Sequence, residues 1–252
     1  MPDFVDDVAI VTGASSGIGA ATAHELSRCG ARIVLAARRS DKLQEQERAI
    51  VAAGGTAISV PTDVSDPCQL LGLYKRAIDE FGHVDIVVNN AGASWFRPLA
   101  ETTPEELARL VHVNLLGAMV LTRAVLPAML ERNHGALIFV GSLSGRVAME
   151  PAYSATKYGL RGFALALRRQ LVATGVSVSL VSPGNIRTDM TAHVPGVLPE
   201  PIVVAEEIRE LIRRPRREVI VPRRHYAIAW LDQLAPAVAD RAHRWRHWSP
   251  VQ

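Results

Sequence analysis

Tyr153 and Lys157 are the two residues whose types and spacing suggest chemistry most directly. They are four positions apart, so their side chains share one face if the segment is a helix. A phenol with its ordinary pKa near 10 is a poor acid or base at neutral pH, and a neighbouring ammonium lowers that pKa by favouring the phenolate. The pair could therefore exchange a proton with a substrate oxygen, with Tyr153 as acid for reduction and base for oxidation.

Two further polar residues could complete such a site. Ser142 follows an apolar segment, eleven residues before Tyr153, and its hydroxyl could bind the substrate oxygen. Ser144 is a rival for that role. Asn114 lies in an otherwise apolar helical stretch, where a buried amide must find partners. It could act in the chemistry or be a satisfied core amide without a catalytic role.

A glycine-rich turn near the start of the chain could hold a phosphate group. Its glycines permit close approach of a pyrophosphate, and the N-terminus of the helix that follows supplies free N–H groups and a positive dipole end. A tight structural turn is the alternative. The candidate cofactor-binding residues of this turn are Gly13, Ser15, Ser16, Gly17, Ile18 and Gly19.

The end of the second apolar segment bears on the choice between NAD and NADP. An acidic residue there would bind the ribose hydroxyls of NAD. Here Ala36-Ala37 is followed by Arg38 and Arg39, and no carboxylate occurs before Asp41. A guanidinium suits a 2′-phosphate, so we predict NADP(H), with Arg38 as the main contact and with Ser15 and Arg39 assisting. Alternatively, Arg39 faces solvent.

Alternation of strands and helices predicts the elements that position these residues. We expect an α/β fold: a single doubly wound Rossmann-type domain (residues 1–222) with a mostly parallel seven-stranded sheet and helices on both faces, followed by a basic, Trp-containing helical extension (223–252). The expected strands are 8–12, 32–37, 56–60, 84–88, 136–140, 176–181 and 218–221. The expected helices are 18–29, 41–53, 67–81, a long helix from Pro104 with Thr103 as its cap and a kink at Pro127, and 153–174.

The right-handed crossover rule brings the carboxyl ends of all these strands to one edge of the sheet. Six candidate residues then lie at that edge: Gly13, Arg38, Asp63, Asn90, Ser142 and Gly184. Packing alone is a poor explanation for this convergence.

Taken in order with the run Asn89-Asn90-Ala91-Gly92, these motifs resemble the short-chain dehydrogenase/reductase family over about residues 5 to 222. The resemblance implies a catalytic set of Asn114, Ser142, Tyr153 and Lys157, in which Lys157 also binds the nicotinamide ribose and Asn114 anchors a water. Many NADP-preferring relatives carry a basic residue at the position of Ser16, so a preference for NADP is expected here, not strict selectivity.

The resemblance also implies further contacts to the cofactor. Asp63 would bind the adenine amino group, although it could instead cap the following helix, and Val64 would flank the ring. The remaining implied contacts are Asn90, Ala91 and Gly92 near the adenosine ribose, Tyr153 and Lys157 at the nicotinamide ribose, and Pro183, Gly184, Ile186 and Thr188 around the carboxamide.

Apolar segments near the site favour an apolar ketone, aldehyde or secondary alcohol as the substrate. These segments are 93–96, 147–149 and 193–199. The leading function is thus NADP(H)-dependent carbonyl reduction or alcohol oxidation. A non-catalytic NADP(H) sensor or scaffold is the alternative, and a lyase or epimerase using the cofactor transiently is a third possibility.

Composition bears on the cellular location, on membrane spans and on metal binding. Two cysteines are too few for disulfide bonds to stabilise a fold of 252 residues, and no signal peptide is recognised, so a cytoplasmic protein is expected. No uncharged apolar run reaches about 18 residues, so no membrane-spanning helix is expected. The eight histidines form no metal constellation.

The basic excess belongs to the tail, where ten Arg face four acids between Arg209 and Arg246. Without a recognition module it does not indicate nucleic-acid binding. Pro236 is expected to divide the tail into two helical pieces. They could pack on a partner subunit or the substrate entrance, which is the favoured reading, or contact a membrane peripherally, or be solvated. A homodimer or homotetramer is expected.

Overall fold

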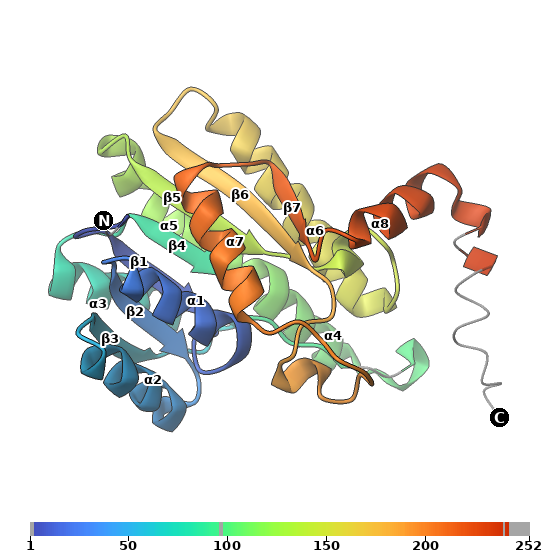
Figure 1. The fold of residues 1–252 in the computed structure, drawn as a ribbon, viewed down its shortest axis with the longest axis horizontal. Coiled ribbons are helices and arrows are strands. Elements are labelled where there is room, and N and C mark those ends of the chain that lie inside the picture. Colours follow the sequence, from blue (N-terminus) through green and yellow to red (C-terminus); the bar gives the residue numbers. More distant parts are fainter. Residues whose placement is uncertain (1–2, 96–97, 239, 242–252) are drawn as a thin grey trace.

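A computed structural model of the chain describes residues 3–95, 98–238 and 240–241. Seven strands form one sheet in the order β3-β2-β1-β4-β5-β6-β7, and every neighbouring pair is parallel (Figure 1). The order reverses between β1 and β4, so the sheet is doubly wound, as predicted. The strands are β1 Val8–Thr12, β2 Arg32–Ala37, β3 Thr56–Pro61, β4 Ile86–Asn89, β5 Gly135–Val140, β6 Val176–Pro183 and β7 Glu218–Val221.

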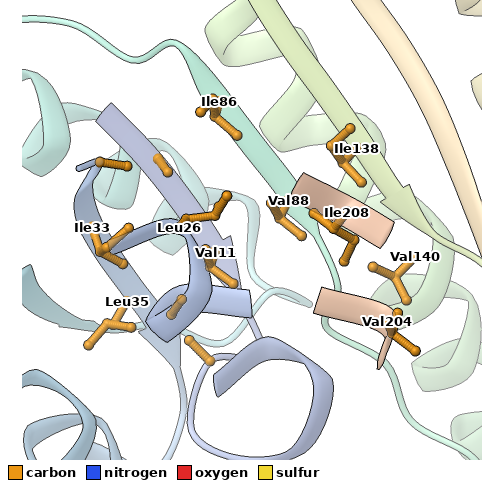
Figure 2. Close-up of a cluster of buried hydrophobic side chains, with 14 of the residues drawn as sticks. Val11, Leu26, Ile33, Leu35, Ile86, Val88, Ile138, Val140, Val204 and Ile208 are labelled. Carbon is orange, nitrogen blue, oxygen red and sulfur yellow. The ribbon is translucent and has the colours of Figure 1, made fainter. Parts of the chain in front are cut away.

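Helices cover both faces of the sheet. On one face α1 (Gly17–Arg28), α2 (Ser40–Ala52) and α7 (Ile202–Arg213) pack against strand residues such as Val11 and Ile138, and Figure 2 shows Leu26 and Ile208 in this cluster. On the other face lie α3 (Pro67–Phe81), α5 (Gly117–Glu131) and α6 (Pro151–Gln170). The central strands are buried on both sides, which explains their near-continuous apolar sequences.

Several element boundaries differ from the sequence prediction; β4, for example, spans Ile86–Asn89 instead of 84–88, and β6 extends to Pro183. β3 continues through Pro61, which an edge strand tolerates because it needs fewer backbone donors. α6 ends at Gln170, not Thr174, since the Thr174 hydroxyl donates to the carbonyl of Leu171 and competes with helical bonding. α7 was not predicted, although its buried Val204, Ala205, Ile208 and Leu211 have helical spacing.

A long helical segment runs from Pro104 to Glu131. α4 (Pro104–Val111) begins with the expected Thr103 cap, which forms a capping box with Glu106. α5 continues through Pro127, and the irregularity in hydrogen bonding lies earlier, in a π-helical turn at His112–Leu116. By length and composition this segment could cross a membrane; its inner face, with Leu121 and Val125, belongs to the core.

The C-terminal segment projects beyond β7 (Figure 1). α8 (His225–Leu234) ends just before Pro236, where helical residues resume, as the sequence predicted. Ala229 anchors α8 by packing with Leu143 and Ile220. Trp230 is 59% exposed and Leu234 is 75% exposed, so most of this helix is unpartnered among the described residues. Trp245 and Trp248 lie outside the described residues.

Candidate active site

A cleft of about 670 Å³ lies at the carboxyl ends of the strands. All six residues that the sequence placed at this edge line it: Gly13, Arg38, Asp63, Asn90, Ser142 and Gly184. These residues follow six different strands, so the parallel sheet has gathered side chains from across the chain into one cavity.

The glycine-rich turn forms one wall of the cleft. Gly13 and Gly17 have φ values of +68° and +57°, which disfavour a side chain, and a Cβ on Gly19 would lie 2.3 Å from the carbonyl oxygen of Gly13. Ser16 precedes α1 but its side chain does not cap the helix. The turn therefore leaves α1 N–H groups open toward the cleft, as anion binding requires. Ser15, Ser16, Gly17 and Ile18 line the cleft with Gly13, and Gly19 lies behind them.

Asn90 fixes the floor of the cleft by joining two strands. Its Nδ2 donates to the carbonyl of Thr12 at 2.9 Å, and its backbone N–H donates to Thr12 Oγ1 at 3.0 Å. The backbone N–H of Ala91 also donates to Thr12 Oγ1, at 3.1 Å. Thr12 thus orients the loop after β4, a role that sequence reasoning missed.

Asp63 shares the cleft with two cationic side chains, Arg38 and Arg109. Burial alone would raise the pKa of Asp63, but hydrogen bonds from Ser65 and the charges of Arg38 and Arg109 hold it below the usual range. Its Oδ1 accepts from the Ser65 N–H and hydroxyl, whereas α3 is capped by Asp66. Asp63 therefore bonds Ser65 within its own turn and lines the cleft, and Asp66, not Asp63, caps α3.

Arg39 contacts the glycine-rich turn while its side chain remains partly exposed to solvent. Its Nη2 donates to Ser15 Oγ at 3.0 Å and to Ser16 Oγ at 2.7 Å. Its side chain is 50% exposed, so the guanidinium remains at the cleft surface. Val64, Ala91 and Gly92 line the same cleft, as do Pro183, Ile186 and Thr188 from the loop after β6.

At the other end of the cleft lie Tyr153 and Lys157, from the start of α6. Lys157 is buried, its Nζ donates to the carbonyl of Val140 at 3.1 Å, and it lies 5.7 Å from the centroid of the Tyr153 ring. Burial lowers the pKa of Lys157 to about 8.

Burial also raises the pKa of Tyr153 to about 12, although a hydrogen bond with Ser142 opposes this rise. The sequence prediction that the Tyr153 pKa is lowered is therefore wrong for this structure. Desolvation outweighs an ammonium that is directed to a carbonyl oxygen.

Ser142, not Ser144, faces this end of the cleft. Ser142 lines the cleft and bonds with Tyr153. Ser144 is buried outside it, and its backbone N–H donates to Ser142 Oγ at 3.1 Å. That bond fixes the Ser142 side chain at the start of a short 3-10 turn.

Asn114 sits in the π-helical turn, next to the main cleft. Its Oδ1 accepts from the Ala93 N–H at 2.7 Å, and its Nδ2 donates to the Ala93 carbonyl at 2.9 Å and to Thr156 Oγ1 at 3.1 Å. A Cβ on Gly92 would lie 3.4 Å from Asn114 Oδ1 and 3.7 Å from Lys157 Nζ. Asn114 also lines a small adjoining cavity of about 10 Å³, near the minimum that one water needs.

The segments expected to form the substrate side divide into two groups. Ala93, Ser94 and Trp95 line the cleft; Phe96 lies outside the described residues. Val147 packs in the small cluster beneath α8 and does not line the cleft, so that expectation is wrong. The segment 193–199 contributes no lining residue to the cleft either. The residues just before it do line the cleft, namely Asp189, Met190 and Thr191.

Sequence reasoning also missed Arg109 and Val113, which line the cleft from α4 and the π-helical turn. Their four-residue spacing on a helical pattern was the available signal.

The C-terminal extension begins against the cofactor-side loop. A Cβ on Gly184 would lie 2.2 Å from two atoms of the His225 ring, so a glycine is needed where α8 starts. His225 Nδ1 is buried and has no partner among the described residues.

Within the described part of the chain, one group of side chains has a metal-binding arrangement: Asp7, Asp85 and His134. It lies at the opposite end of the sheet from the cleft, where β1 and β5 begin. Asp85 already accepts from the Val8 N–H at 2.9 Å and pairs with Arg132 at 2.7 Å. Both oxygens of the Asp85 carboxylate therefore already have partners within the protein.

Comparison with known proteins places these features in a family context. Residues 7–196 match the family model described as short chain dehydrogenase. A ketoacyl reductase, HetN, of Nostoc sp. is 35% identical over 97% of this chain and 91% of its own length. Dehydrogenase/reductase SDR family member 7B of Bos taurus is 29% identical over 93% of this chain and 79% of its own.

Two solved structures share the fold. A metagenomic short-chain oxidoreductase in complex with NADP is 38% identical, with a TM-score of 0.78 over 86% of this chain and 97% of that one. A variant of actinorhodin polyketide ketoreductase with NADPH is 30% identical, with a TM-score of 0.80 over 85% and 95% of the two chains.

Proposed function

Because the chain belongs to the short-chain dehydrogenase/reductase family, we propose that it transfers hydride between NADP(H) and an apolar carbonyl compound or secondary alcohol. The observation that carries this proposal is the sharing of one cleft by two sets of residues. Ser142, Tyr153 and Lys157 lie at one end, and Arg38 and Arg39 lie at the other.

The residues present fit a dinucleotide phosphate. The crowded glycine turn leaves no room for a Cβ at Gly19, and the open N-terminus of α1 suits a pyrophosphate. Arg38 and Arg39 would hold the 2′-phosphate, and Asp63 would accept from the adenine amino group. The NADP and NADPH complexes of the two solved relatives support this assignment. When bound, the cofactor supplies or accepts the hydride.

The chain's own residues then handle the substrate oxygen and its proton. Ser142 donates a hydrogen bond to the carbonyl oxygen, and Tyr153 donates the proton that turns this oxygen into a hydroxyl during reduction. The phenol is protonated at neutral pH, so it carries the proton that reduction requires, although burial raises its pKa to about 12 and makes release of that proton harder. In oxidation the same atoms work in reverse, with Tyr153 accepting the proton.

Lys157 and Asn114 would resupply that proton. Lys157 has a pKa of about 8, close to physiological pH, so it can exchange protons readily. Asn114 holds the Ala93 backbone, and the preceding Gly92 approaches both Asn114 Oδ1 and Lys157 Nζ. We assign to it the anchoring of a water between Lys157 and solvent.

The pocket supports an apolar substrate. Trp95, Met190 and Val140 line the cleft together with the uncharged Ser94. These apolar lining residues favour a carbonyl compound with an apolar body. A homo-oligomer fits the exposed apolar Val111, Leu116 and Leu130 of the long helical segment.

Consumption of NADPH tests the proposal. The purified protein should oxidise NADPH in the presence of at least one member of a panel of apolar ketones and aldehydes, and Tyr153→Phe should abolish this turnover. If both proteins bind NADPH and neither turns over any member of a broad panel, the sensor or scaffold function is favoured instead.

A further inference from the structure

A three-residue contact joins two separate walls of the cleft. Ser16 Oγ donates to Asp189 Oδ2 at 3.2 Å, and Arg39 Nη1 donates to the same oxygen at 3.5 Å. Arg39 Nη2 also donates to Ser16 Oγ at 2.7 Å, which closes a triangle of contacts. We call Ser16, Arg39 and Asp189 the Ser-Arg-Asp clasp.

The clasp spans segments that are far apart in sequence. Ser16 belongs to the turn before α1, Arg39 follows β2, and Asp189 begins a short 3-10 turn after β6. The neighbouring residues also meet, because a Cβ on Gly17 would lie 3.0 Å from Thr188 Cγ2. The Asp189 side chain is 75% exposed, so this is a surface contact at the cleft and not a core ion pair.

The clasp surrounds the Asp189 carboxylate with groups that suit an anion. They are a guanidinium, a serine hydroxyl and the nearby N-terminus of α1. Arg39 also donates to Ser16 and so lies beside it. Its positive charge is thus close to the position where many NADP-preferring relatives carry a basic residue and this chain has a neutral serine.

We propose that Asp189 is a specificity-determining residue, whose carboxylate competes with the 2′-phosphate of NADP(H) for Arg39 and Ser16. This inference rests on the proposed use of NADP(H). A 2′-phosphate bound at Arg39 meets Asp189 either as a rival for the same donors or as a like charge beside it. Both effects weaken binding of NADP(H). Neither acts on NAD(H), which has no 2′-phosphate. Asp189 thus limits a preference that Arg38 and Arg39 create.

Binding titrations of the full chain with NADPH and NADH, followed by calorimetry, test this role without relying on turnover. Asp189→Asn keeps the size of the side chain and removes its charge. We expect it to tighten NADPH binding by about 1.5- to 5-fold, the range that corresponds to an exposed ion pair, and to leave NADH binding nearly unchanged. In an Arg39→Gln background the same substitution should give a smaller selective gain, because competition for the Arg39 guanidinium is gone.

Asp41→Asn is the matched control. It removes an exposed carboxylate two residues from Arg39, in the first turn of α2. A general change of local charge would affect both variants alike, whereas the proposal requires a larger effect at Asp189. Asp189→Ser provides a second variant, and thermal melting checks that each protein is folded.

Several results would overturn the inference. One is an equal gain for NADPH and NADH in Asp189→Asn; another is an undiminished gain without Arg39. If the wild type binds NADPH and Asp189→Asn leaves the ratio of the two affinities unchanged, this inference alone falls. If the wild type binds neither cofactor, the proposed function falls with it.

Discussion

Lys157 Nζ donates a 3.1 Å hydrogen bond to the carbonyl oxygen of Val140, the last residue of the strand that leads to Ser142. This bond holds a buried ammonium at the base of the cleft, and burial lowers its pKa from 10.5 to about 8. The same desolvation that makes the lysine a ready proton carrier near neutral pH also makes its charged form costly to the fold.

The first prediction concerns the pH dependence of stability. The folded protein releases the Lys157 proton at lower pH than the unfolded chain, so between about pH 8 and 10.5 the unfolded state binds more protons. The free energy of unfolding of the wild type should therefore rise relative to that of Lys157→Met across this window, by up to about 1.4 kcal/mol per pH unit. Urea denaturation at several pH values measures it.

Lys75→Met is the control for this experiment, because Lys75 is 75% exposed and pairs with Asp79 on the surface. Its profile should run parallel to that of the wild type. Parallel profiles for Lys157→Met as well would show that the Lys157 pKa is not lowered.

The second prediction separates catalysis from binding. Tyr153→Phe removes one hydroxyl and should lower kcat at least about 100-fold, the lower end for loss of an acid–base group, while NADPH affinity changes little. Tyr158→Phe, on the same helix, removes a hydroxyl that donates to the Arg146 carbonyl outside the cleft, and should stay active. Similar losses in both variants would argue for a structural effect.

The third prediction addresses cofactor preference. Arg38→Ala should weaken NADPH binding by about 10- to 150-fold, which corresponds to about 1.5–3 kcal/mol for a charge-assisted hydrogen bond, and should barely affect NADH. Arg48→Ala, which removes an exposed arginine of α2 that bonds only its own helix in the described structure, is the matched control. Equal losses for both cofactors would contradict the role of Arg38.

The fourth prediction concerns the end of the sheet away from the cleft. Burial, followed by the charge of Asp85, raises the pKa of Asp7. A raised folded pKa means that the group favours folding when protonated and opposes it once pH rises through that pKa. Asp7→Asn should therefore raise Tm at pH 7, and the gain should shrink as pH falls toward 4.

Thermal melts between pH 4 and 8 measure this gain, with Asp6→Asn as the control. Asp6 is the adjacent carboxylate and its side chain is 83% exposed, so little change is expected. A drop in Tm for Asp7→Asn at pH 7 would show instead that attraction to nearby cations dominates.

The sequence predicted what depends on local pattern. The glycine-rich turn around Gly13 and Gly17 could be recognised from its composition, and Tyr153 and Lys157 share a helix face by spacing alone. Each property belongs to a few adjacent residues, so it can be recognised without the fold. The gathering of six strand ends followed from one rule of chain handedness.

Properties that depend on the surroundings of a side chain could not be predicted in this way. The raised pKa of Tyr153 depends on how deeply the folded chain buries the phenol. The contact of Arg39 with Asp189 joins residues 150 positions apart. The π-helical turn around Asn114 has no sequence signal that separates it from ordinary helix, because its residues also fit a helical pattern.

That turn restricts how the chain can change in length. α4 presents Arg109 to the cleft, while α5 presents Leu121 and Val125 to the core, and the turn at His112–Leu116 sets the rotation between these two faces. Loss or gain of a single residue there would rotate one face by roughly 100° relative to the other. An insertion or deletion in this turn would therefore displace either the core residues or the cleft residues, so relatives that keep both must keep this segment at fixed length.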